Sequence, residues 1–362
     1  MPFVSIILSA AISSALLPAI IHFAHKYKLY DRINERKIHN GDIPRLGGVG
    51  ITLSFLVAYG IIGSLEGIRA DEFSRQYHLW PVLSAGTALF VLGLVDDLID
   101  LRARIKFIVQ SLAALFIMSF GFRFRVILIP WGKGMIDLGI LSFPITYIWI
   151  IGVTNAINLI DGLDGLAGGI ALISSMTFGI FYWAQGMAIA ADISMALAGA
   201  AAGFLIYNTA PARIFMGDSG SLFLGFSLAF LPLLGQRSDG AEIGLISAST
   251  TLAIPIFDTL IAIYRRKRAG ISFFTSDKGH FHHILLRKFQ SVSKAVLCIY
   301  SINVLLSGAA LSTIFLGRDR SFPVKIAALI LVGSALFVLN AINTRHPGTS
   351  EDGGGLKGRL RS

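Results

Sequence analysis

The chain has 362 residues, of which 54% are hydrophobic and only 14% are charged, and this apolar fraction argues against an ordinary soluble domain. Its single cysteine, Cys298, excludes an internal disulfide and a cysteine-based metal cluster, so a metal ion would need oxygen or imidazole ligands. The net charge of +10 on such an apolar chain is typical of basic loops beside a bilayer, and we expect no nucleic acid as a partner.

Eleven apolar stretches, each long enough to cross a bilayer as a helix, follow one another along the chain. They lie near residues 3–24, 46–65, 79–95, 105–122, 137–154, 165–185, 188–207, 219–235, 242–264, 294–316 and 322–343. Unpaired backbone groups are costly in hydrocarbon, and the stretches lack the alternation of barrel strands. The sequence therefore predicts an all-α polytopic membrane protein, with one transmembrane domain over residues 1–343 and a basic, disordered tail over 344–362.

The basic residues are distributed unevenly between the two sides of this arrangement. No basic segment precedes the first stretch and one follows it, which favours a retained helix with the N-terminus outside. The segments 25–45, 96–106, 208–218, 265–294 and the tail then share one side and hold 22 of the 31 Lys and Arg residues. The positive-inside rule places this side and the C-terminus in the cytoplasm.

Five polar motifs fall on the side that is predicted to be cytoplasmic. They are PRLGG (44–48), VDDLIDL (95–101), NAINLIDGLDGLAGG (155–169), FMGDSGSL (215–222) and DKGHFHH (277–283). Incidental polar clusters would be divided between the two faces. The sequence therefore predicts a site at the cytoplasmic interface.

The second motif contains a DDxxD string, formed by Asp96, Asp97 and Asp100. This string suits a diphosphate bound through Mg²⁺, because hard cations take carboxylate oxygens and keep phosphates as co-ligands. A solvated turn at a helix end explains the same residues without a function. Lys106 and Gln110 follow one helical turn apart and could face the same site, although Lys106 could instead extend to the interface.

The third motif repeats polar residues at intervals of three: Asn155, Asn158, Asp161 and Asp164. A helix would place them near one face. Asx turns between two spans are the alternative. Four amides and carboxylates within ten residues at a membrane boundary favour a functional cluster over turns alone.

In the fourth motif, Asp218 precedes small residues that open a helix, where free backbone N–H groups and the helix dipole favour a phosphate. A metal ion on its carboxylate would bring that phosphate in. The alternative is a simple helix cap.

The last motif offers His280, His282 and His283 as zinc ligands, phosphate donors or polar loop residues. Zinc normally takes three or four protein ligands and no cysteine is near, so hydrogen bonding to phosphates is the preferred interpretation. Asp258, in IPIFDT, lies about 10 Å below the end of its expected span at a rise of ~1.5 Å per residue. An ionisable residue at that depth is either a functional candidate or one half of a buried pair.

Taken in order, PRLGG, VDDLIDL with Lys106 and Gln110, NAINLIDGLDGLAGG, FMGDSGSL, IPIFDT and HFHH resemble the motifs of the polyprenyl-phosphate N-acetylhexosamine-1-phosphate transferases, glycosyltransferase family 4. The resemblance covers residues from about 30 to 290. DDxxD and HFHH are similar to the branch that uses UDP-GlcNAc or a related aminosugar to start O-antigen (lipopolysaccharide), common-antigen or teichoic-acid chains. Phe281 replaces an aliphatic residue often seen in that string, which leaves the exact aminosugar open.

The resemblance implies a catalytic domain over residues 1–343, in a bacterial inner membrane, that transfers an aminosugar phosphate, with GlcNAc expected, from a UDP-sugar to undecaprenyl phosphate. It implies Mg²⁺, or Mn²⁺ in its place, on Asp218 and Asn158, and the lipid phosphate beside Asp96 and Asp97. Asp161 would lie near the nucleotide diphosphate and Asp164 near the uracil. The further substrate-binding residues are Arg45, Lys106, Asn155, His280, His282 and His283. Assembly as a homodimer stays open.

Two other functions remain as alternatives. A Mg²⁺-dependent intramembrane prenyltransferase also binds a diphosphate through Asp-rich motifs, but it would need a second DxxxD-type cluster, which the sequence lacks. A transporter would place its polar groups at the midplane in interrupted helices, and Asp258 alone points that way.

Overall fold

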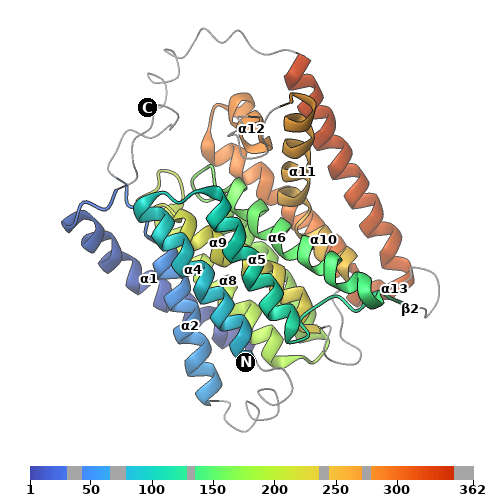
Figure 1. Cartoon of the computed structure of the whole chain (residues 1–362), viewed down its shortest axis with the longest axis horizontal. Coiled ribbons are helices and arrows are strands. Elements are labelled where there is room, and N and C mark those ends of the chain that lie inside the picture. Colours follow the sequence, from blue (N-terminus) through green and yellow to red (C-terminus); the bar gives the residue numbers. More distant parts are fainter. Residues whose placement is uncertain (31–42, 66–78, 129–134, 236–243, 271–278, 346–362) are drawn as a thin grey trace.

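In a computed structural model of the chain, the described residues are 1–30, 43–65, 79–128, 135–235, 244–270 and 279–345 (Figure 1). They form the helices α1 (Pro2–Lys26), α2 (Gly47–Leu65), α4 (Trp80–Ile99), α5 (Ala103–Ser119), α6 (Ser142–Ile160), α7 (Leu166–Ala184), α8 (Ala188–Asn208), α9 (Gly217–Leu234), α10 (Leu245–Thr251), α11 (Ala253–Arg268), α12 (Phe281–Phe289) and α13 (Val292–Arg345). An antiparallel hairpin of β1 (Val126–Leu128) and β2 (Met135–Asp137) precedes the short 3-10 helix η1 (Gly139–Leu141). The hairpin was not predicted. The predicted tail lies outside the described residues, apart from the end of α13.

The described helices agree with an all-α polytopic membrane protein. In the part of the chain that the structure describes, nine segments are long and apolar enough to cross a bilayer, and a bent pair makes ten. Helix α13 supplies two of these segments, because Gly317 interrupts it with a φ of +72°. The expected count of eleven is not confirmed among the described residues, where α5 has only 17 residues and carries Arg104 and Lys106 near its start. The side of the membrane that each end faces stays a prediction.

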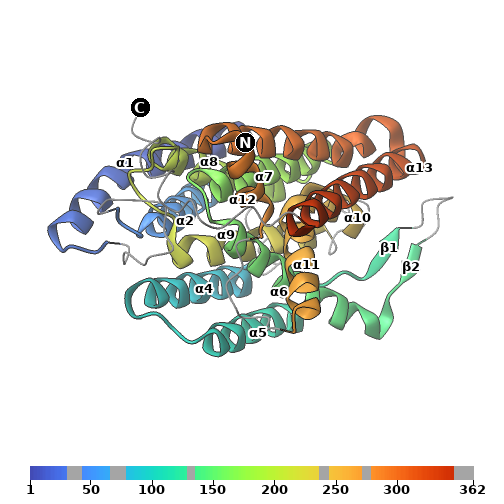
Figure 2. The ribbon, with the colours of Figure 1, turned by 90° about the horizontal axis from the view of Figure 1, so that it is seen from above.

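The expected span over 242–264 is not one continuous helix. The chain there forms α10 and α11, which meet at an angle of 83° across Leu252. Pro255 explains the break, because a proline ring clashes with the carbonyl four residues earlier and the residue offers no N–H. Helix α11 therefore leaves the direction of α10 and lies against α6 and α13 (Figure 2).

Helices α8 and α9 form the centre of the bundle. Helix α8 packs on α1, α2 and α7, and α9 packs on α4, α6 and α2. Small residues allow the close approach: a side chain at Gly199 of α8 would meet the backbone of Ile6 in α1. Because α9 is buried along nearly its whole length, its first turn, which contains Asp218, lies among the surrounding helices at one end of the bundle.

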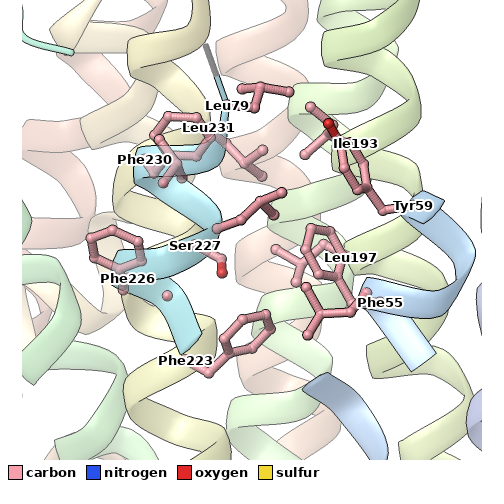
Figure 3. A pocket seen from close by; sticks show the side chains of 14 residues that line it. Phe55, Tyr59, Leu79, Ile193, Leu197, Phe223, Phe226, Ser227, Phe230 and Leu231 are labelled. Carbon is pink, nitrogen blue, oxygen red and sulfur yellow. The ribbon is translucent and has the colours of Figure 1, made fainter. Parts of the chain in front are cut away.

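An apolar pocket lies between α2, α4, α8 and α9, and Phe55, Leu197, Phe223 and Phe226 line it (Figure 3). Gly86 on its wall precedes Asp96 by ten residues of the same helix, which is about 15 Å along α4. The pocket therefore lies farther along these helices than the polar end of the bundle.

Candidate active site

A carboxylate cluster is formed by Asp96 on α4, Lys106 on α5 and Asp218 on α9. Lys106 Nζ lies 2.9 Å from Asp96 Oδ2 and 2.9 Å from Asp218 Oδ2. The Leu101 N–H donates to Asp96 Oδ1 at 2.7 Å, which holds the turn that brings α5 back toward α4. Asp96 is buried, whereas the side chains of Asp218 and Lys106 are 18% and 24% exposed to solvent. The cluster is therefore open on one side. Two carboxylates from distant segments thus share one cation.

Asp97 has a different set of partners from its neighbour Asp96. Its Oδ1 accepts the N–H of Asp218 at 2.7 Å, and its Oδ2 accepts the N–H of Ser219 at 3.0 Å. Asp97 therefore caps α9 from outside that helix, and it occupies N–H groups that the sequence suggested for a phosphate. Gly217 allows this approach, because its φ is +72° and a side chain there would meet the Asp97 carboxylate.

Backbone hydrogen bonds connect the PRLGG motif to the FMGDSGSL motif. The Phe215 N–H donates to Pro44 O at 2.8 Å, and the N–H groups of Gly47 and Gly48 donate to Phe215 O and Met216 O at 2.9 and 2.8 Å. These bonds place Arg45 close to the start of α9. Arg45 is half-buried, and its positive charge acts on both Asp161 and Asp218.

Asn155 and Asn158 lie on one face of the last turns of α6, which continues to Ile160, beyond the predicted end at 154. Asn155 Nδ2 donates to Gln110 Oε1 of α5 at 2.7 Å, and Asn158 Nδ2 donates to Ser221 Oγ of α9 at 2.8 Å. Among the described residues, none donates to Asn158 Oδ1. That amide oxygen is therefore available as a ligand near the carboxylate cluster.

Asp161 and Asp164 follow the end of α6 and do not continue its face. Asp161 directly follows the last residue of the helix, and its burial and the negative charge of Asp218 raise its pKa to about 7, although Arg45 opposes the shift. Asp164 is buried, and its Oδ2 accepts the Ala212 N–H at 3.0 Å. The three-residue spacing predicted one helical face for all four residues. In the structure, only Asn155 and Asn158 share a helical face.

Asn208 holds the same loop and was missed by the sequence analysis. Its Oδ1 accepts the Gly165 N–H at 2.9 Å, and its Nδ2 donates to Ile214 O at 2.8 Å. The side chain thus connects the loops that follow α6 and α8. The only signal in the sequence was an amide directly after the apolar stretch 188–207.

A histidine cluster is formed by Asp258, His280 and His282. Asp258 Oδ2 lies 2.8 Å from His280 Nδ1, so the depth of Asp258 reflects a buried pair. The rings of His280 and His282 are nearly parallel, at 10° and 5.6 Å between centroids. Burial and the neighbouring His283 lower the pKa of His282 to about 3, so its ring is uncharged at neutral pH.

The histidine cluster contacts the third motif through Gly162. A side chain at this glycine would lie 2.5 Å from His282 Nε2. His283 is half-buried, with its ring centroid 4.3 Å from that of His282. All five polar motifs are thus joined by contacts.

Asp100 is exposed at the end of α4, with a φ of +60°, and Lys278 lies outside the described residues.

The donor groups fit a magnesium ion better than a closed zinc site. In the part of the chain that the structure describes, no three His, Cys, Asp or Glu side chains converge in the manner of a preformed metal cage. Mg²⁺ usually takes one or two carboxylates and completes its octahedron with water and phosphate oxygens. Asp218, already next to a cation, and the free amide oxygen of Asn158 supply that kind of donor set.

Comparison with known proteins places this chain among relatives of one type. Residues 79–236 match the model of glycosyl transferase family 4. The chain is 35% identical over 308 residues to a Bacillus subtilis protein named "Probable undecaprenyl-phosphate N-acetylglucosaminyl 1-phosphate transferase", covering 85% of this chain and 84% of that protein. It is 35% identical to a Mycobacterium tuberculosis decaprenyl-phosphate N-acetylglucosaminephosphotransferase, with 84% and 80% covered. It is 29% identical to the Escherichia coli K12 undecaprenyl-phosphate alpha-N-acetylglucosaminyl 1-phosphate transferase, with 78% and 77% covered. The chain therefore belongs to glycosyl transferase family 4, the family of polyprenyl-phosphate N-acetylhexosamine-1-phosphate transferases.

Proposed function

We propose that this protein transfers GlcNAc-1-phosphate from UDP-GlcNAc to undecaprenyl phosphate and releases UMP, as the first step of lipid-linked cell-surface glycan synthesis. The observation that carries the proposal is the carboxylate cluster, in which Asp96 and Asp218 share a cation at the first turn of α9. The names of relatives that cover most of the chain support the substrates.

In this reaction an oxygen of the lipid phosphate attacks the β-phosphorus of the donor, and the bond from that phosphorus to the oxygen of UMP breaks. Asp218 and the amide oxygen of Asn158 would hold Mg²⁺, or Mn²⁺ in its place, and the ion would neutralise charge on the diphosphate. Lys106 and Arg45 add fixed positive charge beside the transferred group.

The acceptor needs little activation, because the second pKa of a phosphate monoester is near 6. We therefore assign Asp96 to positioning the lipid phosphate or taking its residual proton, without a covalent enzyme intermediate. Asp97, beside it in the same proposed acceptor region, acts by holding the backbone of Asp218. Asp161 and Asp164 contact the nucleotide, and Asn155 and the three histidines, His280, His282 and His283, complete the donor side.

The proposed place of the site is the cytoplasmic interface of a bacterial inner membrane. A UDP-sugar is charged and water-soluble, whereas a polyprenyl chain is dissolved in the bilayer. A site at the end of the helices can reach both substrates.

The direct test incubates the purified protein with undecaprenyl phosphate, Mg²⁺ and a panel of UDP-sugars, and measures UMP. We expect release with UDP-GlcNAc that depends on the lipid. If no UDP-sugar of the panel gave UMP and the protein acted on a prenyl diphosphate, the result would favour a prenyltransferase. A trapped phospho-aspartate, or label exchange between UMP and UDP-GlcNAc without lipid, would contradict direct attack by the acceptor.

A further inference from the structure

Asp258 uses both of its carboxylate oxygens on two consecutive residues of the HFHH string. Its Oδ2 pairs with His280 Nδ1 at 2.8 Å, and its Oδ1 accepts the Phe281 N–H at 2.8 Å. His280 is the N-cap residue of α12 and Phe281 is its first residue. Asp258 therefore caps α12 from α11, and all three residues are buried.

This pairing fixes the chemistry of the His280 ring. A carboxylate can only accept, so the proton of the imidazole lies on Nδ1, and Nε2 is left with a lone pair or a second N–H. Among the described residues, His282 Nδ1 is a buried atom that has no hydrogen-bond partner. His280 Nε2 is not such an atom. The two stacked histidines thus differ: a carboxylate orients His280, whereas Nδ1 of His282 has no hydrogen-bond partner among the described residues.

The break between α10 and α11 is what brings this carboxylate to the histidines. A straight helix continuing from α10 would carry Asp258 along its own axis, whereas the turn of 83° at Leu252 sets α11 against α6 and α13. The histidine cluster in turn packs against Gly162, next to Asp161.

We propose that Asp258 is a positioning residue, which fixes His280 so that its Nε2 is the ring nitrogen available to the phosphates of the substrates. The proposal rests on the proposed function for the identity of those phosphates. Asp258 itself touches no substrate and acts through His280.

Replacement Asp258→Asn tests this assignment with little change of shape. The amide oxygen can still accept the Phe281 N–H, but the amide then turns an N–H toward His280 Nδ1. That arrangement moves the imidazole proton to Nε2. We expect kcat for UMP release to fall roughly 10- to 100-fold, as for other groups that orient a functional histidine, and KM for UDP-GlcNAc to change by less than about threefold.

A double-mutant cycle separates positioning from a general loss of packing. If Asp258 acts through His280, Asp258→Asn added to His280→Gln should lower kcat no further than His280→Gln alone. If the two substitutions together lowered kcat by the product of their separate effects, the proposal would be overturned. Asp192→Asn is the matched control, because Asp192 is also a buried membrane-helix carboxylate, bound by Ser5 Oγ at 2.7 Å, and we expect it to keep kcat within about threefold.

Solid-state ¹⁵N NMR of histidine-labelled wild-type protein gives a readout that needs no turnover. The difference spectrum against His280→Gln isolates the His280 signal, which should show a protonated Nδ1. A bare Nδ1 would overturn the inference even in a fully active enzyme. If the wild type released no UMP from any UDP-sugar, the proposed function would fail, and the NMR signal would still decide whether Asp258 holds this proton.

Discussion

The carboxylate cluster and the histidine cluster lie at the same end of the bundle but are built differently. The first balances two aspartates against Lys106, and two of its three side chains keep some exposure. In the second, Asp258, His280 and His282 are all buried, and His282 is uncharged at neutral pH. An open ionic cluster can exchange its cation and admit phosphates, whereas a buried cluster is fixed by packing. We infer that the first binds and neutralises, and that the second orients.

The largest effect is expected from the ionic side of this comparison. Asp218→Asn removes the proposed metal ligand, and we expect turnover to fall by roughly 1000-fold or more, as when a group that stabilises transition-state charge is lost. The thermal unfolding midpoint should stay close to the wild type, because the Asp97 cap uses the backbone N–H at this position. UMP release and a melting curve check both statements. Near-normal turnover would remove Asp218 from the metal site.

Lys106→Met tests whether the ammonium group holds the place of a metal ion. Its loss removes the cation that Asp96 and Asp218 share, so Mg²⁺ should bind the substrate-free protein roughly tenfold more tightly, since a competing charge at this distance is removed. Turnover should nevertheless fall about 10- to 100-fold, because the lysine also stabilises the transferred phosphoryl group.

Isothermal titration with Mg²⁺ and a UMP assay measure the two effects of Lys106→Met separately. Lys294→Met changes an exposed lysine at the start of α13 and serves as the control. Unchanged Mg²⁺ affinity in Lys106→Met would mean that the lysine and the metal occupy different places.

The histidine side should respond to packing more than to charge. A methyl group at Gly162 would lie 2.5 Å from His282 Nε2, so Gly162→Ala must displace the ring, whereas Gly152→Ala in α6 meets nothing within 4 Å. Overpacking of this kind lowers the free energy of unfolding by about 1–3 kcal/mol. We expect roughly a tenfold loss of kcat for Gly162→Ala, because the displaced His282 ring would be misplaced in the proposed site, and no loss for Gly152→Ala. Equal activity in the two variants would separate His282 from catalysis.

The sequence predicted which motifs meet, because span order and the distribution of Lys and Arg assign each loop to a side. In the structure, contacts join the motifs that contain Arg45, Asp97, Asp161, Asp218 and His282. Local spacing also placed Lys106 and Gln110 on one face of α5, and the two residues contact α4 and α6.

The partners of the individual side chains could not be read from the sequence. Asp96 and Asp97 are adjacent in one string, yet one pairs with a lysine and the other caps a helix 121 positions later. That division depends on which side of α4 faces α9. The pairing of Asp258 with His280 depends on the break at Leu252, for which Pro255 was a visible signal. The apolar length of 242–264 outweighed that signal in the prediction of one continuous helix.

The smallest expected effect is a pH dependence that links the two clusters through Asp161. Its pKa of about 7 means that it is protonated below neutral pH and ionised above it. A cation at Asp218 favours the ionised form, so binding of Mg²⁺ should release a proton below pH 7, and its affinity should fall by up to about tenfold per pH unit there and level off above. His282, with a pKa of about 3, does not titrate in this range. Titration of the substrate-free protein between pH 6 and 8 should show this slope in the wild type and a markedly shallower one in Asp161→Asn. A slope that the substitution leaves unchanged would assign the released proton to another group, and the charge of Asp161 would then have no part in the affinity for the metal.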